Sequence, residues 1–169
     1  WGVDIRESEI AKLRSWGLEN VHAVDATGAT HLGRSFEAVH VGDVIEHVSN
    51  PRTELEKAAT LLPSGGILVI NTPDIGSFFA RLMGTRWHLI GPPEHLYYFD
   101  RSTMKRLLKD TGFEVIEETT IGKSFTLKYI AKTLYKWTGL RLFSKLATYF
   151  SRPSLARIAI PINLRDNMF

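Results

Sequence analysis

The stretch that decides how this chain folds is LPSGGILVI, residues 62–70. Residues 63–66 carry the proline, serine and glycines typical of a turn, and residues 67–70 form an apolar run typical of a strand buried on both faces of a parallel sheet. Just before the turn, residues 51–62 have a proline in the first turn and apolar residues at helical spacing, which predicts a helix. Helix, turn and buried strand in succession indicate a layered α/β fold.

The same alternation extends outward in both directions. Further helices are expected at residues 8–16, from about 75 to 83, and at 101–111; strands are expected at 21–24, 36–41 and 113–120, and an irregular stretch at 84–99. Alternating strands and helices from residue 1 to 121 predict a mostly parallel sheet with helices on both faces.

Composition limits the class of protein. The 169 residues are enough for one domain with a hydrophobic core, and 44% hydrophobic with 23% charged residues is typical of a globular protein. The chain has no cysteine, which excludes disulfides and thiolate chemistry. No apolar run approaches the roughly 18 residues needed to span a bilayer, so we expect a cytoplasmic protein.

Charge divides the chain into two parts. Residues 1–121 carry 12 Lys and Arg against 17 Asp and Glu, a net of −5, whereas residues 122–169 carry 9 against 1, a net of +8. In the basic part, Lys128, Lys132 and Lys136 recur every four residues, which predicts an amphipathic helix, and a second apolar and basic stretch follows at 141–150. Such helices can be solvated surface, cap an active site, contact a partner or lie on an anionic membrane.

Three acids follow successive expected strands: Asp4, Asp25 and Asp43. Each alone could be a helix cap or a turn residue. Because ligands of parallel α/β sheets bind at the carboxyl ends of the strands, the three together favour a pocket for a cationic or hydroxyl-rich ligand.

Four segments together resemble the class I S-adenosylmethionine-dependent methyltransferases, in the branch often found as stand-alone bacterial enzymes. They are Gly2-Val3-Asp4-Ile5, residues 36–51 with Asp43-Val44-Ile45-Glu46-His47, residues 62–70, and Pro92-Pro93-Glu94-His95-Leu96-Tyr97-Tyr98-Phe99. The resemblance implies a Rossmann-like cofactor-binding domain at residues 1–121, a basic helical lid or insertion at 122–160, and the start of the last, antiparallel strand of the same sheet at 161–169.

The resemblance also implies S-adenosylmethionine as the cofactor and a binding site at six positions, namely Asp4, Ile5, Asp25, Ala26, Gly42 and Asp43. Asp4 would accept hydrogen bonds from the two ribose hydroxyls, and Ile5 would pack on the adenine. Asp25 would bind the adenine amino group, with a backbone donor from Ala26, and residues 41–43 would pass close to the methionine part.

The family's glycine-rich turn, which follows its first strand, has no counterpart in these residues. Gly65 and Gly66 precede a strand and do not follow one. We therefore expect the first strand of the fold and its loop to be missing from this chain.

Methyl transfer often requires that the acceptor lose a proton, and histidine suits this role because its pKa lies near neutrality. His95 is the candidate general base, oriented by Glu94, because this segment resembles the acid-histidine-aromatic stretch of some sugar carbon-methyltransferases. His47 is expected to face the acceptor. Either histidine could instead be a loop residue bonded to backbone, as the remaining histidines are expected to be structural.

A metal site is an alternative. Asp43, Glu46 and His47 would share one face if they were helical, and a related branch that methylates RNA ribose has a similar cluster. Transfer from a sulfonium needs no Lewis acid, so the main expectation is a site without metal.

Two functions from different classes follow. The first is an S-adenosylmethionine-dependent methyltransferase acting on a small molecule or a saccharide, with no nucleic acid bound. The second is a non-catalytic α/β module whose basic C-terminal helices bind a membrane surface or an acidic partner. The acceptor and the oligomeric state are left open by these residues.

Overall fold

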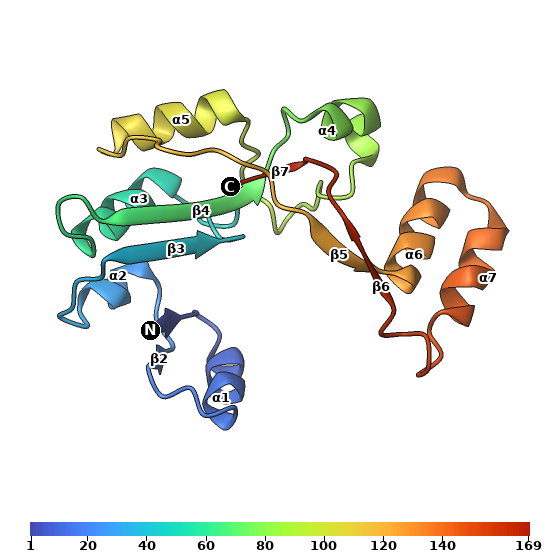
Figure 1. The fold of residues 1–169 in the computed structure, drawn as a ribbon, viewed down its shortest axis with the longest axis horizontal. Helices are drawn as coiled ribbons and strands as arrows, with labels where there is room; N and C mark the ends of the chain where they lie inside the picture. Colours follow the sequence, from blue (N-terminus) through green and yellow to red (C-terminus); the bar gives the residue numbers. More distant parts are fainter.

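A computed structural model describes residues 1–169. Its elements, in chain order, are β1 Gly2–Val3, α1 Glu7–Ser15, β2 Val21–His22, α2 Ala26–Thr30, β3 Ala38–Gly42, α3 Pro51–Thr60, β4 Ile67–Pro73, α4 Phe78–Met83, the 3-10 turn η1 Gly84–Arg86, α5 Arg101–Asp110, β5 Lys123–Thr126, α6 Leu127–Thr138, α7 Arg141–Tyr149, β6 Ala159–Ile162 and β7 Asn167–Met168. Strands and helices alternate through the first two thirds of the chain (Figure 1).

The strands form three sheets. β3 and β4 pair in parallel from Ala38–Ile67 to Gly42–Asn71, and β7 pairs antiparallel with the end of β4. β1 and β2 form a separate parallel pair, and β5 and β6 a separate antiparallel one. Because β3 and β4 are parallel, their carboxyl ends lie at the same edge of the sheet, where ligands of α/β folds bind. Gly42 and Asn71 are paired near this edge.

The core lies between the β3–β4–β7 ladder and the helices α3 and α5. Five buried residues form it, namely Ile45, Leu55, Phe99, Met104 and Met168. Leu55 in α3 and Met104 in α5 supply the helical side, and Ile45 comes from the turn after β3. The core therefore fixes the position of the turn that follows β3.

Two expectations about the last strands need correction. Residues 113–120 form no strand, and only Thr120 makes an isolated antiparallel bridge, to Met168. Thr119 also exchanges two backbone hydrogen bonds with Phe169, so the segment pairs beside β7 at its C-terminal end only. Residues 161 and 162 belong to β6, which pairs with β5, and only Asn167 and Met168 form the antiparallel strand beside β4.

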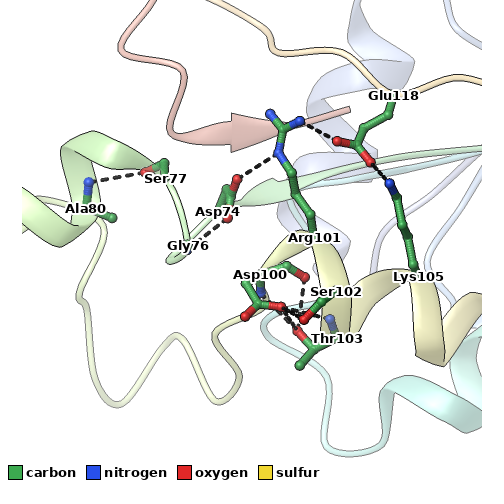
Figure 2. Close-up of polar contacts among 10 residues, drawn as sticks. All are labelled: Asp74, Gly76, Ser77, Ala80, Asp100, Arg101, Ser102, Thr103, Lys105 and Glu118. Carbon is green, nitrogen blue, oxygen red and sulfur yellow. Dashed lines mark hydrogen bonds and ion pairs between the residues drawn. The ribbon is translucent and has the colours of Figure 1, made fainter.

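The N-terminus of α5 is tied to the end of β4 by polar contacts (Figure 2). Asp100 caps the helix by accepting from the Thr103 amide at 2.8 Å, and these hydrogen bonds lower its pKa to about 2. Arg101 donates to the buried Asp74 at 3.1 Å and also pairs with Glu118. The loop that precedes α5, which carries His95, is thereby held against the sheet.

Helices α6 and α7 form a hairpin at one side of the molecule, next to β5 and β6 (Figure 1). Thr126 caps α6 through the Tyr129 amide, and Gly139 ends it with φ of 70°, a left-handed conformation that glycine adopts without strain. None of the helices combines the length and apolar character that crossing a membrane requires.

Candidate functional site

The end of β3 carries a chain of hydrogen bonds. Asn71 donates from Nδ2 to Asp43 Oδ1 at 2.9 Å, and Asn71 Oδ1 lies 2.9 Å from His40 Nε2. Lys123 of β5 reaches the same Asp43 carboxylate at 3.2 Å. A Cβ on Gly42 would lie 2.8 Å from the His40 ring and 3.1 Å from Asn71 Oδ1, so the glycine leaves room for this contact. Asp43 is thus held at the sheet edge by two neighbours.

Asp4 lies at the end of β1 and is engaged by a near neighbour. The Arg6 guanidinium binds both carboxylate oxygens at 2.9–3.0 Å, and the Arg6 amide adds a third bond. These hydrogen bonds hold the pKa of Asp4 below its usual value. Ile5 beside it is 74% exposed. The carboxylate expected to bind ribose is therefore ionised and next to an uncovered apolar side chain.

Asp25 caps the N-terminus of α2, which is one of the two roles expected for an acid after a strand. Its carboxylate accepts from the Gly28 amide at 2.8 Å at the start of α2, and this bond lowers its pKa. Ala26 is the first residue of the helix. Asp4 and Asp25 both follow strands of the parallel β1–β2 pair, so they lie at the same end of that ladder.

His47 and His95 come together although 47 residues separate them in the sequence. The amides of Leu96 and Tyr97 donate to the Glu46 carbonyl at 2.8 and 3.1 Å, which joins the turn after β3 to the loop before α5. The two imidazole rings then meet edge to face, with centroids 4.6 Å apart. Nδ1 of His95 is buried and has no hydrogen-bond partner.

Glu94 does not have the expected relation to His95. Its carboxylate is exposed and makes no hydrogen bond with the His95 ring, and its backbone carbonyl instead lies 2.7 Å from His47 Nδ1. The amides of Glu94 and His95 both bond back to the Gly91 carbonyl, so the two residues end a tight turn of the backbone. Glu94 positions the other histidine.

The expected cluster of Asp43, Glu46 and His47 is not formed. Residues 43–48 are a bend and a turn, with Asp43 at φ of 50°, so these side chains do not share a helical face. Glu46, which is 2% exposed, instead accepts from the Thr72 hydroxyl at 2.9 Å and lies beside His47 and His95. The group of possible metal ligands in the structure is therefore Glu46, His47 and His95, without Asp43.

A cavity of about 180 Å³ lies beneath α6. Ten residues line it, most of them apolar: Phe79, His88, Phe125, Tyr129, Ile130, Thr133, Leu134, Trp137, Ile162 and Leu164. Burial lowers the pKa of His88, whose Nδ1 has no hydrogen-bond partner. Phe125 is two residues from Lys123 on β5, so the strand connects this cavity to the Asp43 edge.

Sequence reasoning missed several side chains that shape the site. Asp43 is contacted by Lys123 and Asn71, and Glu46 by Thr72. Asp4 forms an ion pair with Arg6. The run of Asn71 and Thr72 directly after an apolar strand was a usable signal, because polar residues at that place face the ligand edge. Lys123 offered no such signal, since it contacts Asp43 across 80 residues of chain.

Three solved structures resemble the whole chain in fold. They are a Thermotoga maritima protein described as a SAM-dependent methyltransferase and possible histamine N-methyltransferase (TM-score 0.58, 18% identity, 99% of this chain and 69% of that one), a SAM-dependent methyltransferase from Archaeoglobus fulgidus (0.56, 17%, 99% and 72%) and a putative methyltransferase from Bacillus halodurans (0.55, 14%, 98% and 78%). At these identities the likeness concerns the fold.

No curated protein matches this sequence. The family model described as a methyltransferase domain matches residues 1–118, which are the residues that build the β3–β4 sheet, its flanking helices and both histidine-bearing turns. This chain therefore belongs to the methyltransferase-domain family, with the α/β fold of S-adenosylmethionine-dependent methyltransferases.

Proposed function

We propose that the chain transfers a methyl group from S-adenosylmethionine to a small-molecule or saccharide acceptor, with histidine-assisted removal of the acceptor's proton. The observation that carries the proposal is the match of residues 1–118 to the methyltransferase-domain family. The fold shared with methyltransferases described as SAM-dependent supports the choice of cofactor.

The cofactor would lie along the strand ends. Asp4 would bind the ribose hydroxyls, sharing its lone pairs with Arg6, and the exposed Ile5 would pack on the adenine. Asp25 would bind the adenine amino group through the oxygen that does not cap α2, next to Ala26. Residues 42 and 43 would line the methionine part.

The acceptor would enter between α6 and the 79–99 region. The aromatic cavity there has the size of a cavity that holds a benzene ring, which is about 150 Å³. Besides the imidazole of His88, its lining residues include Tyr129 and Thr133, which carry hydroxyl groups. These features support an acceptor with a compact ring, and the helix above it would exclude water from the transfer.

The proton would leave through the His47 and His95 pair. In the simplest form His95 takes the proton and His47 faces the acceptor, and alignment of acceptor, methyl and sulfur supplies the rest of the acceleration. Nδ1 of His95 has no hydrogen-bond partner in the protein, so it is a free lone pair in the tautomer that carries the hydrogen on Nε2. Glu94 would contribute by fixing the His47 ring through its carbonyl.

Calorimetric titration with S-adenosylhomocysteine tests the cofactor site. The wild-type chain should bind it, and Asp4→Asn should weaken binding by about tenfold or more, because a charged acceptor of two hydroxyl bonds is worth roughly 1.5–3 kcal/mol. Asp110→Asn is the matched control, since Asp110 is an exposed carboxylate paired with Arg52 on α3. Equal binding by wild type and Asp4→Asn would remove Asp4 from the site, and no binding by either protein would contradict the proposed function.

A second test concerns the histidines. With an acceptor in hand, His95→Ala should lower kcat by about 10²–10⁴ while binding of S-adenosylhomocysteine is unchanged. His31→Ala is the control, because His31 is an exposed histidine that does not contact His47 or His95. This variant should have the kcat of the wild type. Turnover at the normal rate in His95→Ala would contradict histidine assistance.

A second candidate function uses the α6–α7 hairpin. Arg141 and Lys145 of α7 have no acidic partner, and Leu142 between them is 62% exposed. This mixture of cations and apolar side chains suits an anionic membrane surface. Salt-sensitive binding to phosphatidylserine vesicles, together with no binding of S-adenosylhomocysteine, would favour the non-catalytic module over the enzyme.

A further inference from the structure

Three potential metal ligands converge where the turn after β3 meets the loop before α5. A carboxylate oxygen of Glu46 and one ring nitrogen each of His47 and His95 all lie within 4.8 Å of one another. The closest measured pair is Glu46 Oε1 and His47 Nε2, which are 3.8 Å apart. The backbone bonds from Leu96 and Tyr97 to the Glu46 carbonyl hold the two segments in this arrangement.

The hydrogen bonding of His47 determines which of its nitrogens is available. Nδ1 lies 2.7 Å from the Glu94 carbonyl oxygen, which can only accept, so Nδ1 carries the hydrogen. In the neutral ring Nε2 is then a lone pair, and it faces the Glu46 carboxylate. Two acceptors that face each other at 3.8 Å are stabilised by a positive group between them, and a bound cation would supply one.

The burial of Glu46 also favours a positive group. Its side chain is 2% exposed, and a buried carboxylate is costly unless it is paired or coordinates a metal. Oε2 accepts from the Thr72 hydroxyl, but no Lys or Arg lies within ion-pair distance of Glu46. The buried Nδ1 of His95 is a further acceptor or donor without a partner. The site therefore has more ligand atoms than the protein itself satisfies.

We propose that Glu46, His47 and His95 bind one divalent transition-metal cation of the Zn²⁺ or Mn²⁺ class. One carboxylate and two imidazoles are the ligand types that these cations take. The hydrogen bonds behind the ligands also fit a metal site. The Nδ1–H of His47 donates to a backbone carbonyl, and Glu46 accepts from the Thr72 hydroxyl, as metal ligands commonly do.

The spacing suits a cation after a small closure. Ligand bonds of about 2.1 Å at tetrahedral angles place donor atoms roughly 3.4 Å apart. The present separations of up to 4.8 Å require each donor to move inward by about 1 Å or less, which side-chain rotation can supply. Three protein ligands leave at least one position of the cation open.

The chemical consequence rests on the proposed function, although the binding itself does not. An acceptor hydroxyl at the open position would release its proton to water more readily, because the cation stabilises the alkoxide. The alkoxide oxygen then bonds to the methyl carbon as the carbon–sulfur bond breaks, and the electron pair of that bond stays on sulfur, giving S-adenosylhomocysteine. With the cation bound, His95 would assist removal of the proton as a ligand of the cation, in place of the direct proton transfer described for the site without metal.

Titration of the full chain with Co²⁺, after removal of metal by EDTA and dialysis, tests the site. We expect visible absorption typical of nitrogen-ligated Co²⁺ that saturates at one equivalent, and competition by Zn²⁺. Glu46→Gln and His95→Ala should each weaken binding by at least tenfold, and Thr72→Val by about tenfold. His31→Ala changes an exposed histidine outside the group and should bind as the wild type does.

Thermal unfolding of each variant separates lost ligation from lost folding. If Glu46→Gln does not fold, His95→Ala and His47→Ala decide, since both rings are partly exposed. The proposal is overturned if the wild type shows no saturable Co²⁺ spectrum, or if His95→Ala binds Co²⁺ as tightly as the wild type. Co²⁺ binding needs no cofactor, so the two proposals can fail separately. Co²⁺ binding without binding of S-adenosylhomocysteine would contradict the proposed function alone. Binding of S-adenosylhomocysteine without Co²⁺ binding would contradict this inference alone.

Discussion

The body matched by the methyltransferase-domain family and the C-terminal hairpin are held together in different ways. The body buries its own core around Leu55 and Phe99. In the hairpin, α6 and α7 pack on each other, and the two buried residues are Ala131 and Ala147. Leu140 and Leu142 are 56% and 62% exposed. Trp137 of α6 joins the hairpin to the body through contacts with Arg86 and Phe79.

The largest expected effect concerns the core of the body. Leu55→Ala removes a side chain with no exposed surface and should lower the free energy of unfolding by about 2–5 kcal/mol, because transfer free energy is lost and a cavity forms. Urea unfolding followed by circular dichroism measures it. Leu142→Ala is the matched control in the hairpin, and a change larger than about 0.5 kcal/mol there would remove the contrast between the two regions.

A smaller and local effect is expected where the hairpin meets the body. Trp137 donates from Nε1 to the Arg86 carbonyl at 2.9 Å and packs against Phe79, with ring centroids 6.0 Å apart. Trp137→Ala should therefore lower the hydrogen-exchange protection of α6 and α7 by about tenfold, and leave β4 protected as in the wild type. An equal loss of protection in β4 would show that the two regions unfold as one unit.

The smallest effect concerns the cap of α5. Because the pKa of Asp100 falls from 3.8 to about 2 in the folded chain, the ionised carboxylate stabilises the fold above about pH 4, and this contribution is lost as the pH falls through about 2. Asp100→Ala should cost about 1 kcal/mol at neutral pH and clearly less near pH 2, where about half of the folded carboxylates are protonated. Denaturant unfolding at both pH values measures this difference, with Asp110→Ala as the control. A cost that does not change with pH would contradict the capping role.

Much of the fold could be predicted from local patterns. The apolar run at 67–70 and the glycine turn before it determine β4, although Ile67 is 43% exposed and the buried residues of the strand are 71–73. Helical spacing determines α3 and α5, because hydrophobic period and turn chemistry are local properties. The strand expected at 113–120 failed for a non-local reason. A strand needs a ladder partner, and within this segment the backbone pairing is limited to Thr119 with Phe169 and Thr120 with Met168.

The candidate site divides along the same line. The sequence by itself determined which residues stand at the strand ends and in the two Glu-His turns, because strand periodicity and turn residues place them there. The tertiary structure alone decided which of them meet. In the structure, His95 lies beside Glu46 and His47, where Asp43 was expected. The Asp43 carboxylate instead pairs with Lys123. Contacts between residues 47 or 80 positions apart depend on how turns and loops pack on a shared core, and no local pattern encodes that packing.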